Sequence, residues 1–218
     1  MVQTRLPGRS LAELLPALLP IDVATILEQV GTLLRRVHAV RVDGFYRRLD
    51  DGSWDFQSYE RLLEVTLRER SAKRPLLREA GFLDDEIDCM LAIVRADGEQ
   101  FPCHQPVLLH GDFHPAHILV DAVTNVSGLI DFGEFQGGSP LVDLATWDLA
   151  ASNLDLAPLL RGYGDPTFFG ADFAQRLAAT KIGLGMGYLA YHVRTGHDEE
   201  ASLIAEELRR TLSAVARR

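Results

Sequence analysis

One stretch in the middle of the chain, residues 108–134, constrains the fold most because it alternates short apolar runs with polar loops (LLHGDFHPAHILVDAVTNVSGLIDFGE). Seven residues, among them the turn formers Asp and Asn, separate the second apolar run from the third. This spacing predicts a β-hairpin whose strands are Ile118–Asp121 and Ser127–Asp131. We therefore expect a small β element near the centre of the chain.

Three side chains able to bind a metal ion would meet at one end of this hairpin: Asp112, His117 and Asp131. Asp112 follows a buried strand, which is a common position for catalytic residues. Phosphoryl transfer needs one carboxylate to accept a proton from a hydroxyl group while another holds a divalent cation. Each aspartate taken alone fits a loop cap equally well, but the two in this order and spacing favour catalysis.

Most of the remaining sequence shows the periodicity of amphipathic helices. Ser10 and Glu13 have the spacing of a capping box at a helix start. Further helices are expected at about 23–37, 56–73, 84–97, 141–151, 156–160, 173–193 and 199–216. The glycines and the proline of Gly137–Pro140 are expected to form a loop. Because no repeat or linker interrupts the pattern, residues 1–218 are predicted to form a single domain of the α+β class, mostly α-helical.

Composition excludes some classes of function. The formal net charge of −9 disfavours a nucleic-acid partner, which normally meets a basic face. No apolar run approaches the length of a membrane helix, so no membrane span is expected. The two cysteines are too few for a disulfide framework, and residues 1–9 do not resemble a signal peptide, which together indicate a cytoplasmic protein with reduced thiols. His104, His192 and His197 show no ligand spacing and are expected to be structural.

The segments HGDFHPAHILV and LIDFGE together resemble the catalytic and metal-binding segments of the aminoglycoside phosphotransferase family, which includes choline-kinase-like enzymes and is related to protein kinases. The resemblance extends upstream to LPGRSL and LLRRVHAVRVDGFY, and downstream to SPLVDLATWDLA and LLRGYG. It implies a kinase-like C-terminal lobe with the small hairpin at its centre. It also implies ATP or GTP as phosphoryl donor, Mg²⁺ or Mn²⁺ as cofactor, and a small-molecule hydroxyl as acceptor, with an aminoglycoside or amino sugar as one class.

The resemblance also implies roles for individual residues. Asp112 would be the catalytic base and Asp131 a metal ligand. Two further residues would brace the catalytic loop, namely His110 and Asp143. Two apolar residues would lie beside the nucleotide, namely Ile118 and Ile130. Two carboxylates are candidates for binding an amino sugar, namely Glu134 and Asp148, although carboxylates near helix ends are more often solvated surface.

The sequence departs from the family pattern in two ways. His117 stands where related kinases usually carry Asn as a second Mg²⁺ ligand. This change leaves open a shifted metal preference, weaker metal binding, a degenerate site, or a histidine that only bonds within its loop. The N-terminal lobe is the second departure, because neither a Gly-rich loop nor a strand lysine is found; the two lysines, Lys73 and Lys181, lie in helical segments. We therefore expect the N-lobe to be absent.

Without that lobe, an apolar face would be left bare, and we expect a homodimer or a partner chain to cover it. Its residues would be Leu6, Pro7, Ile118 and Ile130. Two other functions stay open. One is a degenerate, non-catalytic kinase lobe that serves as a binding or scaffold module. The other is a metal-dependent phosphoesterase that uses the GDFH segment, which the sequence disfavours because the further ligand clusters of such enzymes are missing.

Overall fold

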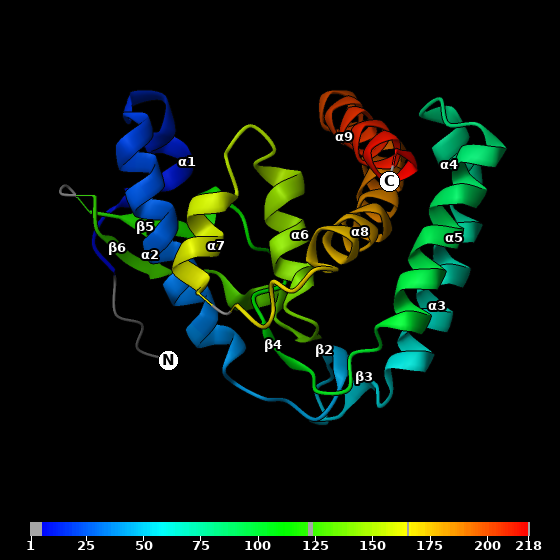
Figure 1. The fold of residues 1–218 in the computed structure, drawn as a ribbon, viewed down its shortest axis with the longest axis horizontal. Helices are drawn as coiled ribbons and strands as arrows, with labels where there is room; N and C mark the ends of the chain where they lie inside the picture. The colour runs from blue at the N-terminus through cyan, green and yellow to red at the C-terminus, as the bar shows by residue number, and fades with distance from the viewer. Residues whose placement is uncertain (1–5, 122–123, 165, 218) are drawn as a thin grey trace.

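The computed structural model describes residues 6–121, 124–164 and 166–217 and shows a mostly helical chain with two small sheets (Figure 1). Its helices are α1 (Leu11–Leu14), α2 (Pro20–His38), α3 (Tyr59–Ala72), α4 (Arg74–Glu79), α5 (Asp84–Gln100), α6 (Leu141–Ala150), α7 (Ala157–Tyr163), α8 (Phe173–Thr195) and α9 (Asp198–Ala216). Short 3₁₀ turns occupy Leu15–Ala17, Pro115–His117 and Phe132–Glu134. The strands are β1 (Arg9–Ser10), β2 (Phe45–Arg48), β3 (Trp54–Phe56), β4 (Val107–Leu109), β5 (Ile118–Val120), β6 (Val126–Leu129) and β7 (Gln136–Gly138).

The central hairpin predicted from the sequence is confirmed. Strands β5 and β6 pair in antiparallel fashion, with Ile118 opposite Leu129. Strand β1 joins them on the other side of β5, so the hairpin is part of a three-stranded sheet. The register places residues 110–117 and residues 130–134 at the same end of the hairpin, which is the end where the polar loops lie.

The expected loop at Gly137–Pro140 is wrong, because β7 begins at Gln136 and runs through both glycines. This strand lies between β2 and β4 in a four-stranded sheet of order β3-β2-β7-β4. A Cβ atom added to Gly137 would lie 2.1 Å from the carbonyl oxygen of Gly44. Glycine is therefore needed for close backbone approach within a strand, and a glycine-rich segment alone did not distinguish a strand from a loop.

The predicted helices are present, with shifted ends. The Ser10 hydroxyl accepts a hydrogen bond from the amide of Glu13 at 3.3 Å, which confirms the cap of α1. The predicted end of the fourth long helix before Gly98 is wrong, because α5 continues to Gln100. A Cβ atom at Gly98 would lie 2.7 Å from the Leu63 side chain. Gly98 thus lets α5 pack closely on α3, and it does not end the helix.

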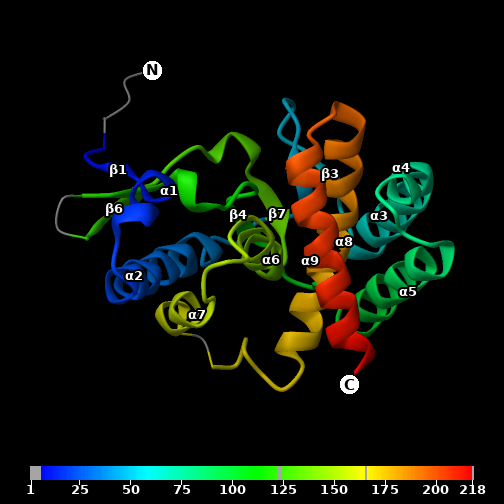
Figure 2. The same ribbon diagram turned by 90° about the horizontal axis from the view of Figure 1, so that it is seen from above.

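Two apolar clusters stabilise the fold. The first joins α2, α6 and α7 to the hairpin and includes the fully buried side chains of Phe113, Ile118 and Trp147. The second joins α4, α5, α8 and α9. Helix α8 links the two halves because it packs against α5, α6 and α9 (Figures 1 and 2). Among the described residues, no helix combines the length and the hydropathy needed to cross a bilayer.

The first cluster corrects one expectation about the surface. Ile118 has a relative exposure of 0%, so it belongs to the core and not to the bare apolar face. The reason is that alternate residues of a strand point to opposite sides of the sheet, and Ile118 lies on the side of the buried cluster that also contains Phe113. Leu6, at 37% relative exposure, does lie at the surface.

A cavity of about 180 Å³ lies between the sheet and helices α3, α5 and α8. Asp97 lines this cavity, and burial raises its pKa from 3.8 to about 6, although Arg176 acts in the opposite direction. Because the folded chain holds this proton more tightly than the unfolded chain, the contribution of Asp97 to stability is fully present below about pH 4 and is lost as the pH rises through 6.

We predict that Asp97→Asn removes this pH dependence. The free energy of unfolding of the native chain should fall, relative to that of the variant, by about 1–2 kcal/mol between pH 4 and pH 7.5, after allowance for solvent screening of a half-buried group. Urea unfolding at both pH values measures the difference. The exposed Asp172→Asn variant is the matched control. The prediction would be contradicted if the free energy of unfolding changed by the same amount between the two pH values in the native chain and in Asp97→Asn.

Candidate functional site

The loop that follows β4 carries His110, Gly111 and Asp112. Gly111 has a positive φ of 84°, and a Cβ atom there would lie 1.8 Å from the carbonyl oxygen of Glu134. Only glycine combines this backbone conformation with such a close approach. The tight turn directs Asp112 away from the core, so its carboxylate is partly exposed while the neighbouring His110 is fully buried.

Asp143 of α6 lies beneath this loop and is fully buried. Its Oδ2 accepts a hydrogen bond from the amide of His110 at 2.7 Å, and its Oδ1 accepts one from the amide of Gly111 at 3.0 Å. The Nε2 of His38 donates to the same Oδ2 at 3.0 Å, and Tyr163 contacts the other ring nitrogen of His38 at 3.0 Å. These bonds join the loop to α2, α6 and α7.

The His110 ring connects the two polar loops. Its Nδ1 accepts a hydrogen bond from the amide of Asp112 at 3.2 Å. The proton of a neutral ring therefore lies on Nε2, which donates to the carbonyl oxygen of Ile130 at 2.8 Å. His110 thus fixes the backbone of Asp112 relative to the residue that precedes Asp131. His110 and Asp143 thus both bond to the backbone of this loop, and the bracing role that the sequence resemblance implies for them stays a prediction.

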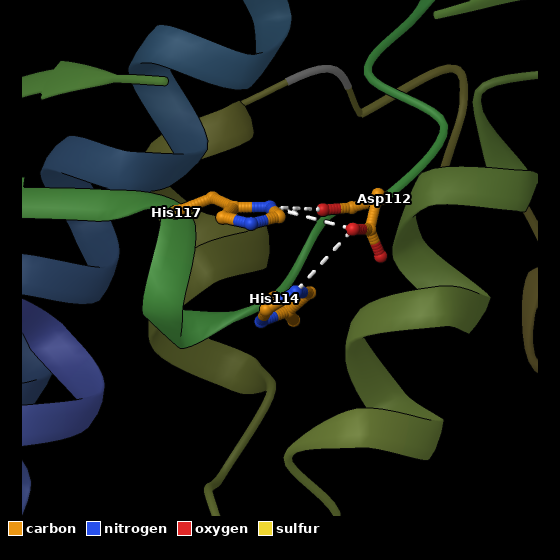
Figure 3. A group of neighbouring side chains, drawn as sticks. All are labelled: Asp112, His114 and His117. Atoms are coloured by element: carbon orange, nitrogen blue, oxygen red, sulfur yellow. Dashed lines mark hydrogen bonds and ion pairs between the residues drawn. The ribbon is translucent and has the colours of Figure 1, made fainter. Parts of the chain in front are cut away.

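Asp112, His114 and His117 form a cluster in which one ligand atom from each lies within 4.8 Å of the others (Figure 3). The Oδ2 of Asp112 is 3.5 Å from Nε2 of His114 and 3.7 Å from Nδ1 of His117. The Nδ1 of His114 accepts from the amide of Ala116 at 3.3 Å, so its Nε2–H faces the carboxylate. The N–H of His114 therefore faces Oδ2 of Asp112, while Nδ1 of His117 lies nearer to the carbonyl oxygen of Asp112, at 2.9 Å, than to Oδ2.

Burial lowers the pKa of His114, and the neighbouring His117 lowers it further. A neutral His114 still offers its Nε2–H to Asp112. The second carboxylate oxygen of Asp112, Oδ1, has no such neighbour among the described hydrogen bonds of this cluster.

His117 also links Asp112 to Asp131. Its Nδ1 donates to the carbonyl oxygen of Asp112 at 2.9 Å, so the lone pair of a neutral ring lies on Nε2. This Nε2 is 3.6 Å from Oδ2 of Asp131. Asp131 itself has a left-handed backbone, with φ 63° and ψ 62°, and an exposed carboxylate. Non-glycine residues in this conformation are uncommon and are often found at functional sites.

This pair of atoms fits a divalent cation. Metal bonds to imidazole nitrogen and carboxylate oxygen are about 2.0–2.2 Å long, so a separation near 3.6 Å lets one ion contact both. Both atoms are free to accept, because the proton of His117 is used elsewhere. Imidazole nitrogen suits Mn²⁺ or Zn²⁺ better than it suits Mg²⁺, which prefers oxygen ligands.

A second cavity, of about 280 Å³, opens beside Asp112. Its polar side chains come from the loop, α6, α8 and α9, namely Asp112, His114, Thr146, Tyr188, His192 and Glu200. Its apolar side chains are Leu149, Ala150, Leu203 and Ile204. Burial raises the pKa of Tyr188, which stays protonated at neutral pH. His192, expected from the sequence to be structural, also lines this cavity.

Neither of the two candidate substrate carboxylates lines the cavity beside Asp112. Glu134 is exposed and accepts a hydrogen bond from Arg47 at 3.0 Å. Asp148 accepts one from Lys181 at 2.6 Å and lines a different cavity. Each of the two carboxylates is therefore already paired with a positively charged side chain of the same protein. The sequence did not reveal Glu200, which lies 88 positions after Asp112 on another helix.

Sequence reasoning also missed the contacts of His38 with Asp143 and Tyr163. A signal was present, because His38 falls within the LLRRVHAVRVDGFY segment on which the resemblance rests. The periodicity of α2 concealed it, since a buried histidine at a helix end has the same spacing as an apolar core residue.

The chain matches a family model described as "Phosphotransferase enzyme family" over residues 1–177. An uncharacterized protein of Bacillus subtilis (strain 168), YcbJ, is 38% identical over 56 residues, which are 26% of this chain and only 18% of that protein. A thermostable mutant of aminoglycoside phosphotransferase APH(4)-Ia, in ternary complex with ADP and hygromycin B, has 16% identity and a TM-score of 0.73, and the match covers 96% of this chain and 70% of that chain. Macrolide 2'-phosphotransferase type I has 22% identity and a TM-score of 0.56, with 84% of this chain and 58% of that chain covered.

Proposed function

Because the chain belongs to the phosphotransferase enzyme family, we propose that it takes part in transfer of a phosphoryl group from ATP or GTP to a hydroxyl group of a small molecule. The observation that supports this most is the loop braced by Asp143 and His110, which holds Asp112 at a cavity and Asp131 close to His117. Similar solved structures support the fold, and one of them binds ADP.

In this proposal, Asp112 acts as the general base. The Nε2–H of His114 faces Oδ2 and orients the carboxylate, and Nδ1–H of His117 donates to the carbonyl oxygen of the same residue. Oδ1 is then left to accept the proton of the acceptor hydroxyl. Phosphoryl transfer depends on positioning and on neutralisation of charge, and the loop supplies the positioning. A divalent ion, when held by Asp131 and His117, supplies positive charge beside the phosphates.

Nucleotide binding tests this function directly. We expect ADP together with Mn²⁺ to raise the melting temperature of the chain, because a ligand that binds only the folded state stabilises it. Ile130, whose carbonyl oxygen is held by His110, is proposed to lie beside the nucleotide. Ile118 lies too deep to contact it directly. Absence of any shift with ADP, ATP or GTP and either metal would contradict the proposal.

His117 carries a specific prediction about the metal. We expect His117→Asn to replace a nitrogen ligand with an oxygen ligand and so to lower the affinity for Mn²⁺ relative to Mg²⁺ by about tenfold. Binding of Mn²⁺, followed by electron paramagnetic resonance with Mg²⁺ as competitor, measures this ratio without any turnover. His104→Asn is the matched control outside the site. An unchanged ratio of Mn²⁺ to Mg²⁺ affinity would show that His117 does not bind the metal and only makes hydrogen bonds within its loop.

The acceptor is proposed to be a hydroxylated compound with one amino group, such as an amino sugar or a fragment of an aminoglycoside. Among the residues that the structure describes, the cavity beside Asp112 has one additional carboxylate in its wall, Glu200, which suits one ammonium group. Its apolar wall, which includes Leu149 and Leu203, suits the carbon face of a sugar ring. Hygromycin B, which the APH(4)-Ia structure contains, is a reasonable first compound in a panel of acceptors.

We also propose that another polypeptide covers the surface around Leu6, Pro7 and Ile130, either a second copy of the chain or a different chain. Leu6 is exposed and its side chain lies over Gly128 of β6. A cytoplasmic location is part of the proposal, with no membrane or nucleic-acid partner, and both cysteines are free. Light scattering that finds a monomer able to bind nucleotide unaided would contradict a covering partner.

A binding or scaffold module without catalysis is the second candidate. The contacts of Lys181 favour it, because this lysine is held by Asp148 and Glu207 at 2.6 and 2.7 Å and is therefore not available to phosphates. This candidate predicts no nucleotide-dependent shift in melting temperature, so the measurement above separates the two functions.

A further inference from the structure

The cavity of about 180 Å³ beside α3, α5 and α8 is distinct from the site around Asp112. No residue lines both this cavity and the one beside Asp112. Its wall is largely apolar and includes the rings of Phe45, Tyr59 and Phe101. Engineered apolar cavities of about 150 Å³ bind benzene, so the space suits one aromatic ring with a small substituent.

Two polar groups of opposite charge line one part of this wall. Within the described chain, Oδ1 of Asp97 and Nε of Arg176 are buried and have no hydrogen-bond partner. The two side chains form no ion pair with each other among the described contacts. The guanidinium group of Arg176 lies over the ring of Phe101, with its central carbon 5.0 Å from the ring centre, which fixes its position.

Unsatisfied buried groups are costly, and native proteins usually satisfy them with protein, water or a ligand. Asp97 needs a donor and Arg176 needs an acceptor. One neutral group that both donates and accepts would satisfy the two together. A third charged side chain of the wall, Arg70, already donates to the carbonyl oxygen of Gly183 at 2.8 Å. A primary carboxamide has this arrangement, since its NH₂ donates and its C=O accepts.

We propose that this cavity is a binding site for a small neutral aromatic amide. The ring would occupy the apolar part, the NH₂ group would donate to Asp97, and the carbonyl oxygen would accept from Nε of Arg176. Leu109, which also lines the cavity, directly precedes His110 in the chain, so an occupant would contact the strand that leads to the catalytic loop.

Cys103 provides a direct measurement, because it lines the same cavity and is partly buried, whereas Cys89 on α5 is exposed. Alkylation of the native chain by iodoacetamide is followed at each cysteine by peptide mass spectrometry, with and without benzamide. We expect benzamide to slow modification of Cys103 at least about fivefold at saturation and to leave Cys89 unchanged. Toluene, which has the ring but no polar group, should protect Cys103 much less.

Variants test the polar contacts. Asp97→Leu removes the acceptor. It should raise the benzamide concentration that half-protects Cys103 by about tenfold or more. Asp172→Leu, at an exposed aspartate at the start of α8, is the matched control and should bind benzamide as the native chain does. The comparison of benzamide with toluene on the native chain does not depend on any variant being folded. Equal protection by toluene, or no protection by benzamide, would overturn the proposal and leave water as the partner of these groups.

Discussion

Asp112→Asn is expected to lower kcat for the proposed phosphoryl transfer by a factor of about 10²–10⁴, the range for loss of a general base. Asparagine has nearly the same shape as aspartate, so the acceptor still fits the cavity, but the amide cannot take its proton. The KM for nucleotide should change little, because Asp112 lines the cavity proposed for the acceptor, whereas Asp131, the proposed metal ligand, does not. Initial rates with saturating nucleotide and acceptor measure the effect.

The control for this variant is Asp172→Asn, at an exposed residue whose side chain makes no capping bond. It should retain full activity. Equal melting temperatures for the two variants would exclude a loss caused by unfolding. If Asp112→Asn keeps more than about a tenth of the native kcat, Asp112 is not the base, because proton transfer by a positioned side chain contributes at least about 10²-fold.

Asp143→Asn is expected to have the largest effect on stability. The carboxylate is fully buried and accepts from two backbone amides and from His38. An asparagine NH₂ group would face one of these donors, and removal of one partner from a buried charged network costs about 3–5 kcal/mol. For a chain of this size, that corresponds to a melting temperature lower by about 6–20 °C.

Thermal unfolding followed by circular dichroism checks this value. Asp148→Asn is an informative comparison on the same helix, because Asp148 is only partly buried and its partner Lys181 keeps a second carboxylate in Glu207. Its effect should be clearly smaller. A drop of less than about 1 kcal/mol in Asp143→Asn would show that the bonds of Asp143 contribute no more than a surface ion pair.

The sequence was sufficient for the parts of the fold that depend on local pattern. The hairpin followed from short apolar runs and a turn, and the long helices followed from a 3.6-residue period. Their ends were less certain, because Gly98 has a packing role within α5 that a breaker rule does not anticipate. Strand β7 was missed for the same reason, since Gly137 is required by the approach of Gly44 from a distant segment.

In the candidate site, too, the residues that are close in sequence could be predicted and those from distant segments could not. Asp112, His117 and Asp131 lie within one continuous stretch, so their convergence could be predicted from the hairpin alone. The cavity beside Asp112 could not, because Tyr188, His192 and Glu200 come from α8 and α9 and meet Asp112 only through tertiary packing. Asp148 was chosen for its charge, but charge does not show which lysine of the same chain is nearby.

The most direct test of the central claim, that the loops at Asp112 and Asp131 form a phosphoryl-transfer site, is mass spectrometry of acceptors after incubation with ATP or GTP and Mn²⁺. The native protein is expected to add one phosphate, about 80 Da, to a hydroxylated amino compound in the panel, and to add none when Asp131→Asn replaces the metal ligand. Two results would contradict the claim. In the first, the native protein binds the nucleotide but phosphorylates no compound of the panel. In the second, Asp131→Asn forms as much phosphorylated product as the native protein.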